Sequence, residues 1–494
     1  MLGLSSEDLA SDKLGEVLGG NHLLPGMQPH AACYGGHQFG NWAGQLGAGR
    51  AISLGERLGT DGELWEMQLK GAGPTPYSRS ADGRAVMRSS VREFLCSEAM
   101  FHLGVPTTRA LSLVSTGDSV VRDMLYNGNA APEPGAIVCR VAPTFLRFGN
   151  FELFAHRQDQ ATLRLLTNYT IRNFFPELLT ESMLAKKSEP GLEEIATFFT
   201  EVCRRTAQMV VSWMRVGFVH GVMNTDNMSI LGLTIDYGPY GWLEDFDPTW
   251  TPNTTDAGGR RYRFGNQPRV CEWNLVQLAN ALLQLGFEPA PFEEGLRVFA
   301  ETLHQEEAKM MAGKLGFLHL ETESINPDKD KSKDRVLVED LNEMLVLLET
   351  DMTIFYRALA NIEISERSLK AESMDALRAP LQNAYYSPNE LTPENVTQID
   401  SWLRKYIQRS LQDGRDEQER QDATNRVNPK FVLRNYLAQQ VIDEAEKGNG
   451  APVMELLEVL RRPYDEQSGQ EQFCGKRPEW ARHRPGCSML SCSS

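Results

Sequence analysis

The sequence lacks long apolar runs and recognisable zinc motifs. No stretch approaches the roughly 18–20 apolar residues of a membrane span, and no basic region followed by an apolar core stands at the N-terminus. We therefore expect no membrane span and no targeting segment in this chain. Six of the eight cysteines are scattered singly, and neither a CxxC pair nor an HExxH helix occurs. This pattern argues against structural zinc and is typical of a reducing compartment.

Basic residues are outnumbered by acidic ones. The 66 acidic and 50 basic side chains give a formal net charge of -16 at pH 7, which repels a phosphate backbone. Nucleic acid is therefore not an expected partner. A phosphate-bearing ligand would need a locally basic pocket. Lysines and arginines within the motifs are therefore stronger evidence for such a site than they would be in a basic protein.

The order of predicted elements indicates an α+β fold. With 494 residues the chain exceeds the roughly 250–300 residues of a single core. Residues 1–145 form a predicted strand-rich N-terminal lobe, with strands at 63–70, 111–114, 119–126 and 136–142. Its single helix is predicted to begin at Ser90, with Glu93 completing a capping box.

Long helices are predicted over 146–460, because apolar residues recur there at three- and four-residue spacing. A tail rich in Gly, Pro and Ser follows over 461–494. This is the outline of a two-lobed protein-kinase-like fold with extra C-terminal helices.

The segment GQLGAGRAISLGE (44–56) places Gly47 and Gly49 between two predicted strands. Backbone amides of such a loop can approach phosphates, although glycines in tight turns often serve conformation alone. Arg50 adds a guanidinium that can grip an anion. Farther along, Asp82 and Gly83 form a turn that either contacts the adenine or ribose or only shapes the chain.

Three further cations and one carboxylate are candidates for holding phosphates. Lys70 ends a predicted strand and Glu93 follows on a helix, an arrangement like the strand lysine and helix glutamate of kinases. Arg140 and Arg147 lie seven residues apart, and two arginines can clamp one polyphosphate. Alternatively, Lys70 is only an exposed strand end and Glu93 only a capping residue. Arg140 and Arg147 would then be ordinary surface cations.

The segment HGVMNTDN (220–227), followed by DYG (236–238), is similar to a kinase catalytic loop but has Val222 at the place of the catalytic Asp. Asn227 and Asp236 supply oxygens of the kind that Mg²⁺ takes, with Mn²⁺ as an alternative. Asp226 is the only carboxylate of the loop that can accept a proton from an attacking hydroxyl. Against this, Asx-rich stretches commonly make turns.

Taken together, these motifs resemble the selenoprotein O family, a kinase-like group. The resemblance covers nearly the whole chain, from CYGGHQFGNWAGQLG (33–47) through CRVAPTFLRFGNFE (139–152) to NPKFVLRNYLAQQ (428–440). It implies transfer of AMP from ATP to Ser, Thr or Tyr hydroxyls of proteins, with release of pyrophosphate. It also implies that the ATP lies reversed relative to a kinase.

The resemblance also implies residue roles. Lys70, Arg140 and Arg147 would hold the β- and γ-phosphates, and Glu93 would orient Lys70. Asn227 and Asp236 would bind Mg²⁺, with Asp226 as the proton acceptor. The nucleotide site would be lined by Gly47, Gly49, Arg50, Asp82 and Gly83. The chain departs from many relatives in having Ala48, where they carry an Asp, and we expect little loss of binding from this change.

The ending GCSMLSCSS looks most like plant or algal members, with Cys492 at the selenocysteine position. A regulatory disulfide between Cys487 and Cys492 would require the tail to bend. Resemblance to eukaryotic members implies a mitochondrial location, with plastid or cytoplasm as alternatives. Two alternatives stay open. The chain could be an ordinary protein kinase or a catalytically inert ATP-binding pseudokinase module.

Overall fold

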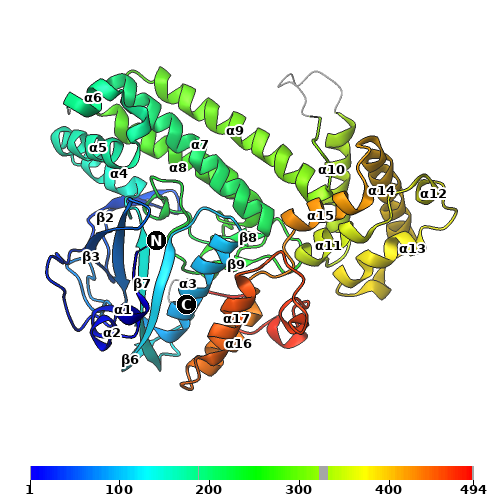
Figure 1. Ribbon diagram of the computed structural model, residues 1–494, viewed down its shortest axis with the longest axis horizontal. Coiled ribbons are helices and arrows are strands. Elements are labelled where there is room, and N and C mark those ends of the chain that lie inside the picture. The colour runs from blue at the N-terminus through cyan, green and yellow to red at the C-terminus, as the bar shows by residue number, and fades with distance from the viewer. Residues whose placement is uncertain (1, 187, 322–331, 492–494) are drawn as a thin grey trace.

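The computed structural model describes residues 2–186, 188–321 and 332–491 (Figure 1). It joins a strand-rich N-terminal part to a helical C-terminal part, which confirms the α+β class. The principal sheet has the strand order β3–β4–β7–β5, and β6 also pairs with β7. Its antiparallel strands are β3 (Ala51–Leu58), β4 (Leu64–Lys70), β5 (Ala85–Val86), β6 (Arg109–Arg122) and β7 (Ala131–Ala142).

Helices cover both faces of this sheet. On one face lies α2 (Asp12–Leu18), which follows the short helix α1 (Ser6–Leu9) in the chain. Val17 and Leu18 of α2 pack with Leu54, Leu69 and Ile137 in a small core. On the other, α3 (Met87–His102) packs against β6 and β7. A separate hairpin, β1 (Gly35–Gln38) and β2 (Asn41–Gln45), stands apart from the sheet.

The predicted capping box of α3 is wrong. The helix begins at Met87, with Val86 as an N-cap that makes no side-chain bond. Ser90 therefore lies inside the first turn, where its hydroxyl donates to the carbonyl of Ala136 at 3.4 Å. The carboxylate of Glu93 binds two cations instead of a backbone amide, because strand pairing places those cations beside it.

The helical part divides into two hydrophobic cores. In the first, the central helices are α4 (Phe148–His156), α5 (Gln160–Phe174), α6 (Glu181–Lys186), α7 (Leu192–Val216), α8 (Gln267–Leu283) and α9 (Ala290–Leu315). The short strands β8 (Phe218–Val219) and β9 (Gly241–Trp242) lie beside them. The same core includes α16 (Asn435–Ala445) and α17 (Ala451–Leu460), which pack against α3 on the side away from the sheet (Figure 1).

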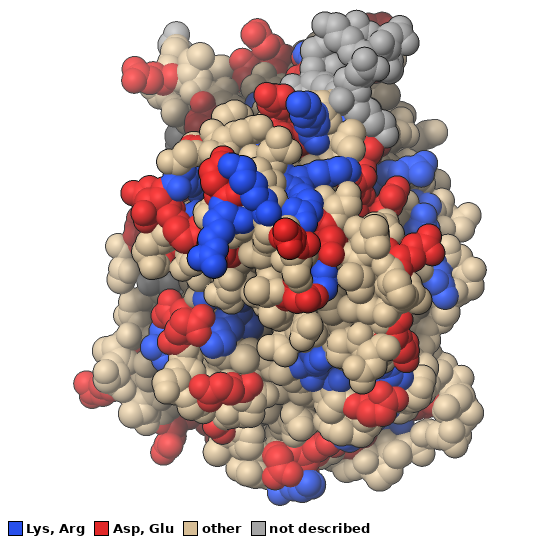
Figure 2. Space-filling view, turned by 90° about the vertical axis from the view of Figure 1, so that its right-hand side faces the viewer, with Lys and Arg blue, Asp and Glu red and all other residues tan. Residues whose placement is uncertain are grey.

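A second core lies at the opposite end of the helical part. It is built around α10 (Lys333–Leu345), α11 (Met352–Ala358), α12 (Glu366–Leu369), α13 (Asp375–Arg378), α14 (Pro393–Gln412) and α15 (Glu417–Val427). On the face that carries α12, α13 and α14, acidic and basic side chains are intermixed (Figure 2).

The segment after α17 packs against the rest of the protein. Leu490 is fully buried, and its N–H donates to the carbonyl of Pro252 at 2.9 Å. The hydroxyl of Ser491 donates to the carbonyl of Met124 in the N-terminal part. Within the described residues, no helix has both the length and the apolarity that crossing a membrane requires.

Candidate active site

A cavity of about 710 Å³ opens between the sheet and the helical part. Nine of the predicted site residues line it, namely Gly49, Arg50, Lys70, Asp82, Gly83, Arg140, Arg147, Asn227 and Asp236. Three predicted residues, Gly47, Glu93 and Asp226, are outside this lining. The structure thus gathers residues that lie as far apart as 49 and 236 in the sequence.

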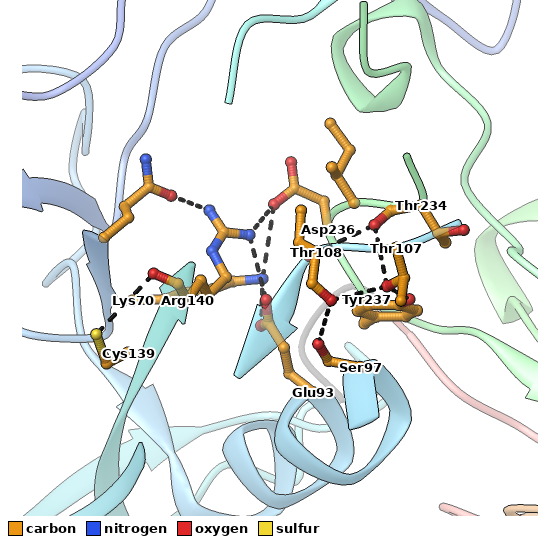
Figure 3. Close-up of polar contacts among 12 residues, drawn as sticks. Lys70, Glu93, Ser97, Thr107, Thr108, Cys139, Arg140, Thr234, Asp236 and Tyr237 are labelled. Atoms are coloured by element: carbon orange, nitrogen blue, oxygen red, sulfur yellow. Dashed lines mark hydrogen bonds and ion pairs between the residues drawn. The ribbon is translucent and has the colours of Figure 1, made fainter. Parts of the chain in front are cut away.

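Strand pairing brings the cations together. Gln68 of β4 lies opposite Arg140 of β7, so Lys70, two residues along β4, is on the same face as Arg140. Both cations reach Glu93, with Lys70 Nζ 2.6 Å from Oε2 and Arg140 Nη1 3.2 Å from Oε1. Figure 3 shows how Arg140 reaches between Glu93 and Asp236.

Asp236 is the centre of this cluster. Its carboxylate accepts hydrogen bonds from Arg140 and Arg147, and its Oδ1 lies 3.8 Å from Lys70 Nζ. The Arg147 guanidinium also donates to the carbonyl of Asp226 at 2.8 Å. The buried cations Lys70, Arg140 and Arg147 therefore face one end of the cavity, and Arg50 is a fourth cation of its lining.

The charges of this cluster stabilise one another. Burial raises the pKa of Asp236, but the neighbouring Arg147, Arg140 and Lys70 outweigh it and hold that pKa well below its ordinary value. Burial lowers the pKa of Lys70, although the adjacent Glu93 counteracts this effect. The four cations of this cluster outnumber the two carboxylates of Glu93 and Asp236. The cluster therefore keeps a net positive charge, which suits a polyphosphate.

Two of the predicted glycines serve packing. Gly47 has φ of 131°, and a Cβ there would lie 2.3 Å from the ring of Tyr77. At Gly83, a Cβ would lie 2.1 Å from the carbonyl oxygen of Gly73. The carboxylate of Asp82, at the rim, is paired with Arg122 at 2.6 Å. These observations favour a structural role for Gly47, while Gly49 lines the cavity.

The catalytic loop presents its oxygens beside the cations. Asp226 lies in the 3₁₀ turn Thr225–Asn227 and is only 7% exposed. Its Oδ2 accepts a hydrogen bond from Gln38 Nε2 at 3.2 Å, and its buried Oδ1 has no partner within the described part of the chain. Burial raises the pKa of Asp226 to about 6, while Gln38 and Arg147 counteract it. A carboxyl with such a pKa is suited to accept a proton near neutral pH.

The oxygens of Asn227 and Asp236 fit a magnesium ion. The side-chain amide of Asn227 donates to the carbonyl of Val222 at 2.9 Å, and its oxygen accepts no hydrogen bond from any described residue. Both residues line the cavity. Over the described ranges no group of three or more His, Cys, Asp or Glu could hold a metal. The two oxygens of Asn227 and Asp236 suit Mg²⁺ because this ion commonly takes one or two protein oxygens together with substrate phosphates and water.

Three residues of the site were not predicted from the sequence. Gln68 accepts a hydrogen bond from Arg140, the ring of Tyr34 lies 4.6 Å from the Arg147 guanidinium, and Gln38 binds Asp226. The alternation of β4 was a usable signal for Gln68, because residues 68 and 70 share a strand face. No comparable local signal exists for Tyr34 and Gln38, whose partners lie more than a hundred residues away.

We expect Gln68→Leu to weaken ATP binding about tenfold. The substitution leaves the buried Nη2 of Arg140 without its acceptor, and an unpaired charged group costs roughly 1–3 kcal/mol. Isothermal titration with Mg·ATP measures the Kd. The matched control is Gln284→Leu, at an exposed position after α8. Equal affinities for all three proteins would contradict the role assigned to Gln68.

Known proteins resemble this chain over its whole length. The family model described as "Protein adenylyltransferase SelO" matches residues 1–461. The chain belongs to this family. Proteins named "Protein nucleotidyltransferase YdiU" are 59% identical in Rhodopirellula baltica, 57% in Aromatoleum aromaticum and 55% in Xanthomonas campestris pv. campestris. Each match covers 100% of this chain and 90% of the relative.

The expected mitochondrial location of this SelO-family chain is wrong. It was taken from eukaryotic members, whereas these relatives are bacterial proteins, and bacteria have no mitochondria. The plant or algal type suggested by the C-terminal ending also has no counterpart among these three relatives. Cys492 lies outside the described residues, and Cys487 is buried, which raises the pKa of its thiol to about 11.

Proposed function

We propose that the protein transfers AMP from ATP to hydroxyl groups of proteins, with release of pyrophosphate. The observation that carries this proposal is the convergence of Lys70, Arg140 and Arg147 at one end of the cavity, beside Asp236. A polyphosphate end bound by these cations would leave the α-phosphorus facing the catalytic loop. The family match and the names of the relatives support the same reaction.

Each side chain of the site then has a defined task. Arg140 and Arg147 bind the β- and γ-phosphates with charge-assisted hydrogen bonds, and Lys70, held by Glu93, adds a third cation. The oxygen of the acceptor hydroxyl forms a bond to the α-phosphorus. At the same time the bond between the α-phosphorus and the oxygen that bridges it to the β-phosphate breaks. The acceptor proton passes to Asp226, and the pyrophosphate leaves with the bonding electron pair, stabilised by the three cations.

A Mg²⁺ ion bound by Asn227 and Asp236 would neutralise negative charge on the phosphates. Manganese has the same oxygen preference and is an alternative. Val222 lines the cavity at the place of the kinase catalytic Asp. A base at that place is unnecessary, because Asp226, four residues later, provides the carboxylate.

The proposal includes a kinase-like arrangement of two lobes. The N-terminal lobe would comprise residues 1–145, the helical lobe 146–460 and the tail 461–494. The antiparallel sheet is covered by α2 on one face and by α3 on the other, so the prediction of a single helix in this lobe is wrong. The sheet and the catalytic loop beside the helical core support this division. Redox control through Cys487 and Cys492 stays a prediction.

Transfer of label from ATP tests the proposed function. We expect radioactivity to enter an acceptor protein from ATP labelled at the α-phosphate and not from ATP labelled at the γ-phosphate. Intact mass measurement of the acceptor should show an increase of one AMP. Label arriving only from the γ-phosphate would identify a protein kinase, and no label from either position would identify an inert ATP-binding module.

A further inference from the structure

Arginines are concentrated in the loop before α8. Arg260, Arg261 and Arg263 follow one another closely there, and no carboxylate within the described ranges makes an ion pair with them. Arg260 donates to the hydroxyl of Thr249 at 3.1 Å, and Arg263 donates to the carbonyl of Arg260 at 3.0 Å. Three guanidinium groups therefore lie close together in a chain whose net charge is -16.

This loop is fixed to the catalytic loop. The carboxylate of Asp256 accepts hydrogen bonds from the backbone N–H groups of Arg261 and Tyr262, at 2.9 and 2.8 Å. The hydroxyl of Tyr262 in turn donates to Asn224 Oδ1 at 2.6 Å, two residues before Asp226. The arginines are therefore held close to the proposed proton acceptor.

An aromatic side chain at the tip of the β1–β2 hairpin joins the same surface. The two-residue turn Phe39–Gly40 has φ of 51° and 85°, as in a type I′ turn, where bulky residues are disfavoured. Phe39 is 36% exposed, and its N–H donates to the hydroxyl of Tyr262 at 2.9 Å. A large side chain in a strained backbone position often marks a functional site.

The hairpin tip also contacts an arginine of the loop. A Cβ at Gly40 would lie 3.4 Å from the guanidinium of Arg261, whose Cζ is 4.6 Å from the ring centre of Trp273. We use the name acceptor surface for Phe39, Arg260, Arg261, Arg263 and Trp273. This surface is continuous with the catalytic loop through Gln38, the hairpin residue that donates to Asp226.

We propose that the acceptor surface binds an acidic segment of the protein acceptor and presents its hydroxyl to Asp226. Guanidinium groups without carboxylate partners are matched by Asp and Glu side chains, with which they form charge-assisted pairs. The ring of Phe39 provides apolar contact beside them. The inference rests on the proposed function, and it adds the substrate class, which is hydroxyl residues flanked by acidic residues.

Three synthetic peptides test this preference. Each carries a single Tyr, flanked on both sides by Asp, by Asn or by Lys. For the wild type we expect kcat/KM for AMP transfer to be about tenfold higher with the Asp peptide than with the Asn peptide, since several exposed ion pairs act together. The Lys peptide should be the poorest acceptor.

Charge reversal provides the matched comparison. In R260E/R263E the order of the three peptides should invert, while K309E/R461E, with the same change in net charge on α9 and beyond α17, should keep the wild-type order. Phe39→Asn suits the left-handed turn and removes the ring. It should lower kcat/KM severalfold for all three peptides without lowering the melting temperature.

The outcomes separate the two proposals. If the wild type labels no peptide, the proposed function fails and the substrate preference fails with it. If all three peptides are labelled with equal kcat/KM, the function holds and the acceptor surface is wrong. Fluorescence anisotropy with the labelled Asp peptide gives a second measure. An unchanged Kd in R260E/R263E would also overturn the inference.

Discussion

Asp226→Asn is expected to lower kcat for AMP transfer by about 10²–10⁴-fold, the usual contribution of a positioned general base. The amide keeps the size of the side chain but cannot take the proton of the acceptor hydroxyl. Asp226 does not line the nucleotide cavity, so the Kd for Mg·ATP should change less than about threefold. Radiolabel transfer at saturating substrate gives kcat, and isothermal titration gives the Kd.

Asp375→Asn is the matched control for this substitution. It makes the same change at an exposed carboxylate of α13, outside the lining of the cavity. Its kcat should stay within about twofold of the wild type. A kcat for Asp226→Asn within about threefold of the wild type would show that another group accepts the proton.

Arg434→Met is expected to destabilise the protein by about 3–5 kcal/mol, because it leaves two buried carboxylates without their cation. Arg434 is 1% exposed, and its guanidinium lies 3.0 Å from Glu244 Oε2 and 2.7 Å from Asp351 Oδ2. These residues join the segment after β9, the N-cap of α11 and the N-cap of α16. The midpoint of urea unfolding, compared with the wild type, measures the loss.

Two further variants make this result specific. Arg461→Met changes an exposed arginine after α17 and should shift the free energy of unfolding by less than about 0.5 kcal/mol. The double variant R434M/E244M removes one stranded carboxylate, so it should be more stable than the sum of the single changes predicts. Strict additivity would contradict a coupled buried cluster.

Local patterns were sufficient to predict most elements of the N-terminal part. The strand 63–70 and the glycine-bearing loop of 44–56 were recognisable because side-chain alternation and backbone requirements act over a few residues. The start of α3 was misplaced, because Ser90 and Glu93 match a capping pattern while tertiary contacts with Ala136 and Lys70 use both side chains.

The candidate site was predictable where the order of motifs resembles that of a kinase. Lys70, Glu93, Arg140 and Asp236 are brought together as that order implies. The contacts of the β1–β2 hairpin were not predictable, because Gln38 and Phe39 meet residues 188 and 223 positions away. Nothing in local periodicity specifies which distant loop a hairpin covers.

A structure of the complex with Mg²⁺ and a non-hydrolysable ATP analogue tests the central claim most directly. We expect the β- and γ-phosphates to lie within hydrogen-bonding distance of Lys70, Arg140 and Arg147, with the α-phosphorus facing Asp226. A γ-phosphate that faces solvent, with the adenine buried among these cations, would contradict it.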